Sequence, residues 1–127
     1  MKGVFLVNSC ISKVLICDDS MLVRKKLRDL LEEMHCQVYE AKDGAECVEL
    51  FKNHQPGTVF MDIVMPELDG LAALKQIKTL DKCAKVIMLS STGTSTKVLE
   101  ALKHGATDFI QKPYTRDQIA KAIGYSE

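Results

Sequence analysis

The stretch VFMDIVMPELDG, from Val59 to Gly70, sets one acidic residue, Asp62, inside an apolar run that Pro66 interrupts. A continuous apolar and β-branched run is typical of a strand that is buried on both faces, as in a parallel sheet. A buried carboxylate is costly unless it has partners. The stretch therefore predicts a central strand whose end presents Asp62 to other polar groups.

The rest of the chain alternates similar runs with helical patterns. Strands are predicted at residues 13–17, 36–41, 58–64, 85–91 and 107–111. A first helix is predicted to begin at Ser20, a good N-cap, and further helices at about 44–54, 70–80, 94–104 and 116–124. Right-handed crossovers between such units require a parallel sheet with helices on both faces. The spacing favours a doubly wound α/β fold and leaves the strand order open.

Composition narrows the classes of protein. The 127 residues suit one domain, and 17 Lys and Arg balance 17 Asp and Glu, so nothing favours direct binding of nucleic acid or an anionic membrane. No apolar window approaches the length of a membrane span, and the apolar core of the N-terminus is too short for a signal peptide. Residues 1–12 are interpreted as an arm of unknown role before a domain at 13–127.

The five cysteines form no CxxC pair. Several lie in apolar runs, where a free cysteine behaves as a small hydrophobic residue. The sequence therefore predicts a reduced, cytoplasmic protein without a disulfide framework or a zinc site.

Polar side chains follow the predicted strands. They are Asp18 and Asp19, then Asp62, then Ser90, Ser91 and Thr92, and finally Lys112 before Pro113. Each alone has an ordinary explanation as a turn or surface residue, but sites in such sheets form at the carboxyl ends of the strands. Clustered carboxylates repel and suit Mg²⁺. A lysine and a hydroxyl nearby suit a phosphoryl group, and an aspartate can form an acyl phosphate.

The ordered motifs LICDDS, MDIVMPELDG, VIMLSST and FIQKPY resemble those of receiver domains of two-component response regulators, over about residues 13–124. The resemblance is strongest to single-domain members of the chemotaxis type. It implies a flavodoxin-like (βα)5 fold with strand order 2-1-3-4-5.

The resemblance also implies roles for single residues. Asp62 would receive phosphate from a sensor histidine kinase or phosphotransfer protein. Mg²⁺ would be held by Asp19, Asp62 and the carbonyl of Val64, with Asp18 acting mainly through water. Ser90 and Lys112 would contact the phosphoryl group, and the bond before Pro113 would be cis, which X-Pro bonds tolerate.

Phe109 falls at the aromatic switch position of the family. Its inward packing would change the face formed by the fourth helix, fifth strand and fifth helix; the alternative is a plain core aromatic. Neither Val64 nor Thr92 carries an acid or amide that could orient an attacking water. Only slow self-directed phosphorylation and slow to moderate dephosphorylation are therefore expected, and no turnover enzyme.

The basic residues Arg24, Lys25, Lys26 and Arg28 lie together on the first predicted helix. They form either a solvated face beside acidic residues or, as the resemblance implies, part of the surface on which the kinase docks.

The leading hypothesis is a stand-alone signalling switch, monomeric or weakly dimeric, that controls a partner which the sequence does not name. One alternative is the N-terminal receiver of a larger regulator. Another is an aspartate-nucleophile phosphatase of the haloacid dehalogenase kind, although its DxD pattern and cap domain are missing. A receiver that has lost phosphorylation is the third, and the complete set of site residues argues against it.

Overall fold

The computed structural model describes residues 12–65, 68–91 and 96–125. Nearly all of the predicted N-terminal arm, residues 1–11, lies outside this part of the chain, as does Thr92.

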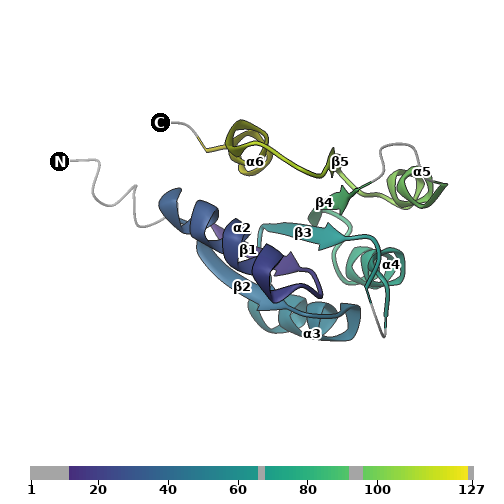
Figure 1. Ribbon diagram of the computed structural model, residues 1–127. Coiled ribbons are helices and arrows are strands. Elements are labelled where there is room, and N and C mark those ends of the chain that lie inside the picture. Colours follow the sequence, from purple (N-terminus) through teal and green to yellow (C-terminus); the bar gives the residue numbers. More distant parts are fainter. Residues whose placement is uncertain (1–11, 66–67, 92–95, 126–127) are drawn as a thin grey trace.

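One parallel sheet forms the centre of the molecule, with strand order β2-β1-β3-β4-β5 (Figure 1). The strands are β1 (Lys13–Cys17), β2 (Gln37–Ala41), β3 (Thr58–Asp62), β4 (Lys85–Ser90) and β5 (Asp108–Gln111). The predicted α/β fold and the order 2-1-3-4-5 are confirmed. The third strand stops at Asp62, two residues earlier than predicted, because the chain turns back there and the Gly70 N–H donates to the Ile63 carbonyl.

Four helices connect the described strands, and a fifth follows β5: α2 (Met21–Glu33), α3 (Gly44–His54), α4 (Gly70–Leu80), α5 (Thr96–Lys103) and α6 (Arg116–Ile123). Side-chain oxygens of Ser20, Asp43, Asp69 and Thr115 accept hydrogen bonds from the first turns of α2, α3, α4 and α6. Such caps satisfy backbone donors that have no partner within the helix. They fix where each helix starts relative to the strand before it.

The helices divide between the two faces of the sheet (Figure 1). Leu27 and Leu31 of α2 and Ile119 of α6 pack with Val14 and Ile16 on one face. The opposite face carries α3, α4 and α5, whose buried side chains pack with Leu15 and Cys17. Successive residues of β1 therefore enter different cores, as the period of a strand requires.

The prediction of a protein without a disulfide is wrong at one pair. Cys17 at the end of β1 and Cys47 in α3 form a disulfide, with Cα atoms 6.0 Å apart. The two cysteines are 30 residues apart in sequence, and only the packing of α3 against the sheet brings them within bonding reach. Of the other described cysteines, Cys36 is free and buried, and Cys83 is free and exposed.

Two glycines hold the loop after β3 close to the rest of the fold. A Cβ at Gly70 would collide with the Asp62 carbonyl oxygen, and one at Gly44 with the Leu68 carbonyl oxygen. The Gly44 N–H donates to that Leu68 oxygen at 3.0 Å. Glycine is needed at both positions because backbone approaches backbone there.

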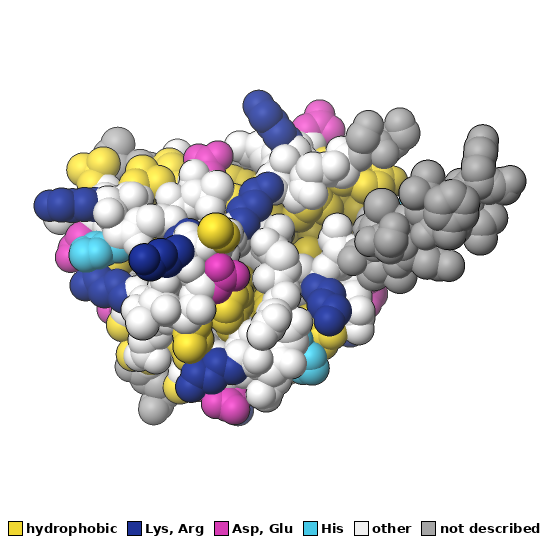
Figure 2. Space-filling model, turned by 180° about the vertical axis from the view of Figure 1, so that it is seen from behind, with side chains coloured by type: hydrophobic (Ala, Val, Ile, Leu, Met, Phe, Trp, Pro, Cys, Tyr) yellow, Lys and Arg dark blue, Asp and Glu magenta, His cyan; other side chains and the backbone are white. Residues whose placement is uncertain are grey.

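Lys and Arg side chains are interspersed with Asp and Glu on the face seen in Figure 2. The sheet ends at β2 on one side and at β5 on the other, strands of five and four residues. No helix within residues 12–65, 68–91 and 96–125 has the length and apolar character needed to cross a membrane.

Candidate functional site

Three carboxylates meet at the carboxyl edge of the sheet. Asp18 and Asp19 follow β1, Asp62 ends β3, and one oxygen of each lies within 4.8 Å of the others. Exposure rises across this acidic cluster. The Asp18 side chain is 2% exposed and that of Asp62 15%, whereas Asp19 is exposed. The cluster is therefore closed at Asp18 and open to solvent at Asp19.

Lys112 reaches the acidic cluster from the end of β5. Its Nζ lies 3.0 Å from Asp18 Oδ2 and 3.6 Å from Asp62 Oδ1. The Lys112 N–H donates to the Ser90 carbonyl at 2.7 Å, and the bond between Lys112 and Pro113 is cis. The backbone at the ends of β4 and β5 thus places the ammonium between two carboxylates.

The charges of this site shift each other's protonation. Burial raises the pKa of Asp62 above its ordinary value; attraction to Lys112 opposes this, and repulsion from Asp18 adds to it. Burial alone would lower the pKa of Lys112, but the hydrogen bond to Asp18 and attraction to Asp62 outweigh it, so that pKa is raised. One ammonium does not compensate three carboxylates, and the site favours further positive charge.

All four polar groups of Asp18 have partners. Its N–H donates to the Ala41 carbonyl at 3.1 Å, and its own carbonyl accepts from Arg24 Nη1 at 2.7 Å. Oδ1 accepts from the Ser20 N–H at 2.9 Å, and Oδ2 accepts from Lys112 Nζ. Asp18 is consequently a fixed, buried anchor of the acidic cluster.

The remaining predicted site residues lie around this cluster. Ser90 is buried at the end of β4 beside Gln111 of β5. Phe109 is partly buried against the core on the α3, α4 and α5 face. Val64 is 67% exposed, and its backbone acts on the pKa of the Asp62 carboxyl in the lowering direction, against the larger effect of burial.

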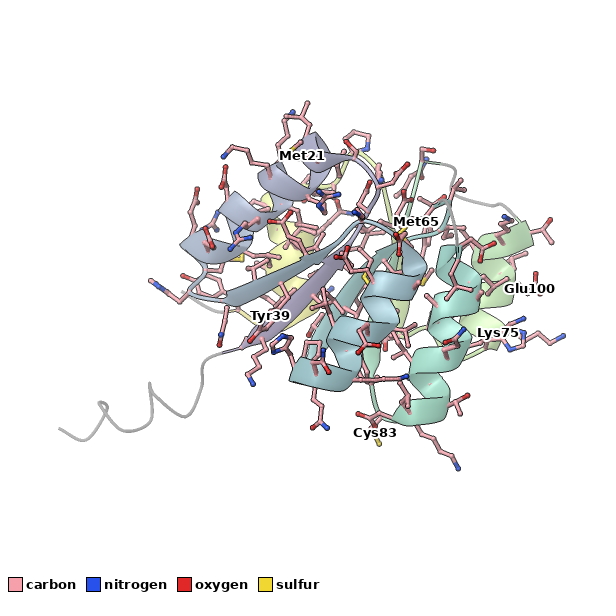
Figure 3. All side chains as sticks on the ribbon, turned by 90° about the horizontal axis from the view of Figure 1, so that it is seen from below. Met21, Tyr39, Met65, Lys75, Cys83 and Glu100 are labelled. Carbon is pink, nitrogen blue, oxygen red and sulfur yellow. A yellow bond between two sulfur atoms is a disulfide. The ribbon has the colours of Figure 1, made fainter. Side chains whose placement is uncertain are left out.

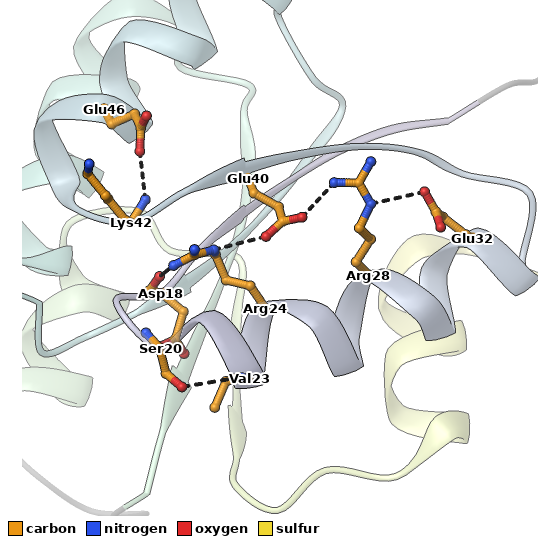
Figure 4. Close-up of polar contacts among 9 residues, drawn as sticks. All are labelled: Asp18, Ser20, Val23, Arg24, Arg28, Glu32, Glu40, Lys42 and Glu46. Carbon is orange, nitrogen blue, oxygen red and sulfur yellow. Dashed lines mark hydrogen bonds and ion pairs between the residues drawn. The ribbon is translucent and has the colours of Figure 1, made fainter.

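The predicted docking residues have partners of their own on the surface of α2 (Figure 4). Arg24 Nε lies 2.9 Å from Glu40 Oε1, and Arg28 contacts both Glu40 and Glu32. These four side chains are the arginine network. Lys25 pairs with Asp29 at 3.1 Å, and both side chains are more than half exposed. Arg24, with a side chain 15% exposed, presents little surface to a partner.

Sequence reasoning missed two features near the site. Glu40 was not expected to pair with Arg24, 16 residues away, because no local pattern links a strand residue to a helix across a sheet edge. Met21 and Leu22, at the start of α2, are 73% and 64% exposed. Figure 3 shows Met21 at the outside of the molecule. Their position directly after the N-cap Ser20, ahead of the apolar stripe of the helix, was the available signal.

The donor set fits a hard divalent cation. Oxygen ligands from one or two carboxylates, with room for water on the open side, are what Mg²⁺ prefers in proteins. The exposed Asp19 and partly buried Asp62 provide such oxygens. No histidine or cysteine belongs to this group of potential ligands within the described residues, so the set does not resemble a zinc site.

Comparisons with known proteins agree with this geometry. The family model of the response regulator receiver domain matches residues 14–124. The chain is 44% identical over 112 residues to the chemotaxis protein CheY of Bacillus subtilis, covering 87% of this chain and 93% of that protein. The CheY of Thermotoga maritima is 41% identical over 112 residues, with the same two coverages.

Solved structures give the same result. A CheX-CheY-BeF3-Mg²⁺ complex from Borrelia burgdorferi contains a chain that is 36% identical, with a TM-score of 0.84, covering 92% of this chain and 90% of that one. A response regulator receiver domain protein from Clostridium thermocellum is 28% identical with a TM-score of 0.85, covering 90% and 92%.

These matches do not favour a phosphatase or a larger regulator, and receiver domains are signalling domains rather than turnover enzymes. The acidic cluster with its lysine, the confirmed strand order and the matched length lead to one conclusion. The chain belongs to the response regulator receiver domain family, resembles its single-domain CheY members, and serves phosphorylation-dependent two-component signalling.

Proposed function

We propose that Asp62 is the phosphoacceptor of this switch. The observation that carries the proposal is the position of its carboxylate, held at the end of β3 with Lys112 Nζ 3.6 Å away. In the transfer, an Asp62 oxygen forms a bond to phosphorus as the bond from phosphorus to the donor histidine nitrogen breaks, and the released imidazole takes up a proton. The product is an acyl phosphate on Asp62.

Mg²⁺ is the cofactor of this proposal. Asp19, Asp62 and the carbonyl of Val64 would hold it, with Asp18 acting through water because both Asp18 carboxylate oxygens already accept hydrogen bonds. When bound, the ion supplies positive charge that offsets the charge of the phosphoryl oxygens. Lys112 adds a second positive charge beside Asp62. The Ser90 hydroxyl is assigned to hydrogen-bond the phosphoryl group.

The readout proceeds through the face formed by α5, β5 and α6. A move of Ser90 toward the phosphoryl group would open space for Phe109 to pack inward. Because Phe has no hydroxyl, the change rests on packing. Leu99 and Leu102 of α5 are 63% and 41% exposed, and these apolar side chains give a downstream protein a surface that can be altered.

A sensor histidine kinase or phosphotransfer protein is the proposed donor, and it docks beside α2. Exposed Met21 and Leu22 supply apolar contact, and Lys25 and Arg28 supply charge. The similarity to proteins named for chemotaxis supports a role in chemotaxis. A cytoplasmic location is proposed from the similarity to CheY proteins and not from the cysteines, two of which form a disulfide. A monomer or weak dimer and slow self-directed loss of phosphate complete the proposal.

The test is the intact mass of the protein after incubation with acetyl phosphate, with and without Mg²⁺. The native chain is expected to gain one phosphoryl group only with Mg²⁺, and the isosteric Asp62→Asn variant none. The absence of an adduct in every condition, or an equal adduct on the variant, would contradict the role of Asp62.

A further inference from the structure

Arg24 stands out among the residues around the site because it touches the main chain of the acidic cluster and none of its carboxylates. Its Nη1 donates to the Asp18 carbonyl at 2.7 Å, while its Nε donates to Glu40 at 2.9 Å (Figure 4). The side chain is 15% exposed. It thus joins the loop after β1 to the neighbouring strand β2.

The carbonyl that Arg24 holds belongs to the peptide bond that leads into Asp19. Because a peptide unit is planar, fixing this oxygen also fixes the Asp19 nitrogen and limits where the Asp19 Cα can lie. Asp19 is exposed, so packing holds its side chain weakly. The orientation of the Asp18–Asp19 peptide therefore decides how the Asp19 carboxylate meets that of Asp62.

β2 supports this peptide in two ways. The Asp18 N–H donates directly to the Ala41 carbonyl at 3.1 Å. Glu40, the residue before Ala41, holds the Arg24 guanidinium, and Arg28 holds Glu40 in turn. The guanidinium holds its donors in a fixed fork, so that Nη1 meets the carbonyl while Nε meets the carboxylate, whereas lysine carries its donors on one nitrogen at the end of a flexible stem.

We propose that Arg24 is a positioning residue for Mg²⁺: it orients the Asp18–Asp19 peptide, and Glu40 fixes its guanidinium in the required place. The inference rests on the proposed function, since it concerns the same metal site. It reassigns Arg24 from kinase docking to support of the acidic cluster.

A positioning role and a purely electrostatic role of Arg24 predict opposite effects of its removal on the affinity for Mg²⁺. Arg24 carries positive charge next to a cation site, so by charge alone its removal would tighten Mg²⁺ binding. If Arg24 orients Asp19, its removal weakens binding. Loss of a supporting hydrogen bond behind a metal ligand typically costs about tenfold or more in affinity.

The experiment is calorimetric titration of the native protein, Arg24→Gln, Arg24→Lys and Lys26→Gln with MgCl2. Lys26→Gln is the matched control, because it removes the same charge from the same helix at an exposed position outside the arginine network. Both Arg24 variants are expected to raise the Mg²⁺ Kd about tenfold, and Lys26→Gln to leave it within about twofold. Thermal unfolding identifies a variant that has lost its fold, and Arg24→Lys keeps the charge if Arg24→Gln does not fold.

Amide NMR spectra of the metal-free proteins provide a second readout. The signals of residues 18–20 are expected to shift in the Arg24 variants and to stay in place in Lys26→Gln. Native binding with an unchanged or lower Kd in Arg24→Gln would overturn the positioning role alone. A native protein that binds no Mg²⁺ would instead overturn the proposed metal site, and this inference with it.

Discussion

Two charged clusters meet at Asp18 and use similar side chains in different ways. In the acidic cluster, three carboxylates face one ammonium, and the pKa of Asp62 is raised, chiefly by burial. In the arginine network, two guanidinium groups face two carboxylates. There the pKa of Glu40 is lowered, because its hydrogen bonds to Arg28 and Arg24 outweigh the effect of burial. Unbalanced charge leaves a group ready to bind a ligand, whereas balanced charge fixes structure.

The largest loss of stability is expected when Lys112, the ammonium of the acidic cluster, is removed. Lys112→Met leaves the buried Asp18 without its cation, and an unpaired buried charge costs about 3 kcal/mol. Urea unfolding without Mg²⁺ is expected to show this loss, and Asp18→Asn in the same chain should recover most of it. Equal stability of the native and Lys112→Met proteins would mean that water already compensates Asp18.

Mg²⁺ should stabilise the protein through the acidic cluster and not through the arginine network, because only the acidic cluster has an excess of negative charge. Saturation with MgCl2 is expected to raise the free energy of unfolding by about 1–2 kcal/mol over the same protein in EDTA. Asp19→Asn should abolish most of this gain, and Glu32→Gln, in the arginine network, should not. Stabilisation of all three proteins by the same amount would indicate a general salt effect.

The paired charges of the arginine network should make stability depend on pH through the lowered pKa of Glu40. A carboxyl whose pKa is lowered by folding stabilises the protein above its unfolded pKa, and this contribution is lost as the pH falls through its folded pKa. Glu40→Gln is therefore expected to cost about 1 kcal/mol at pH 7 and to make stability less dependent on pH below about pH 5. Parallel pH profiles for the native and variant proteins would contradict the assignment.

The smallest effect is expected on the outer surface of α2. Lys25 and Asp29 form an exposed pair one helical turn apart, and such pairs contribute about 0.5 kcal/mol or less. Lys25→Gln should unfold within that margin of the native protein. A larger loss of stability would show that Lys25 and Asp29 act together with the arginine network.

Sequence reasoning predicted the acidic cluster well because one rule sufficed. Residues that follow parallel strands share one edge of the sheet, so Asp18, Asp62 and Lys112 could be brought together without knowledge of the strand order. The order itself came from the resemblance. Helix starts followed from capping residues such as Ser20, which act over a few positions only.

What escaped prediction depends on register and packing over longer separations. The contact of Arg24 with Glu40 needs Glu40 to lie beside Ile16 of β1, and no local pattern fixes that register. The bond between Cys17 and Cys47 needs α3 to pack against the end of β1. Leu99 and Leu102 match a helical stripe in sequence, but only the fold shows that both stay exposed while Val98 is buried.

The short edge strand β5 bears on aggregation. The chain has no net charge at neutral pH, so copies of the protein lack the mutual repulsion that keeps charged proteins apart. An open edge can template the addition of another strand, and short edges limit such pairing. With only four residues, β5 offers little length for another strand to pair with at this edge, and an insertion that lengthened β5 is expected to promote such pairing.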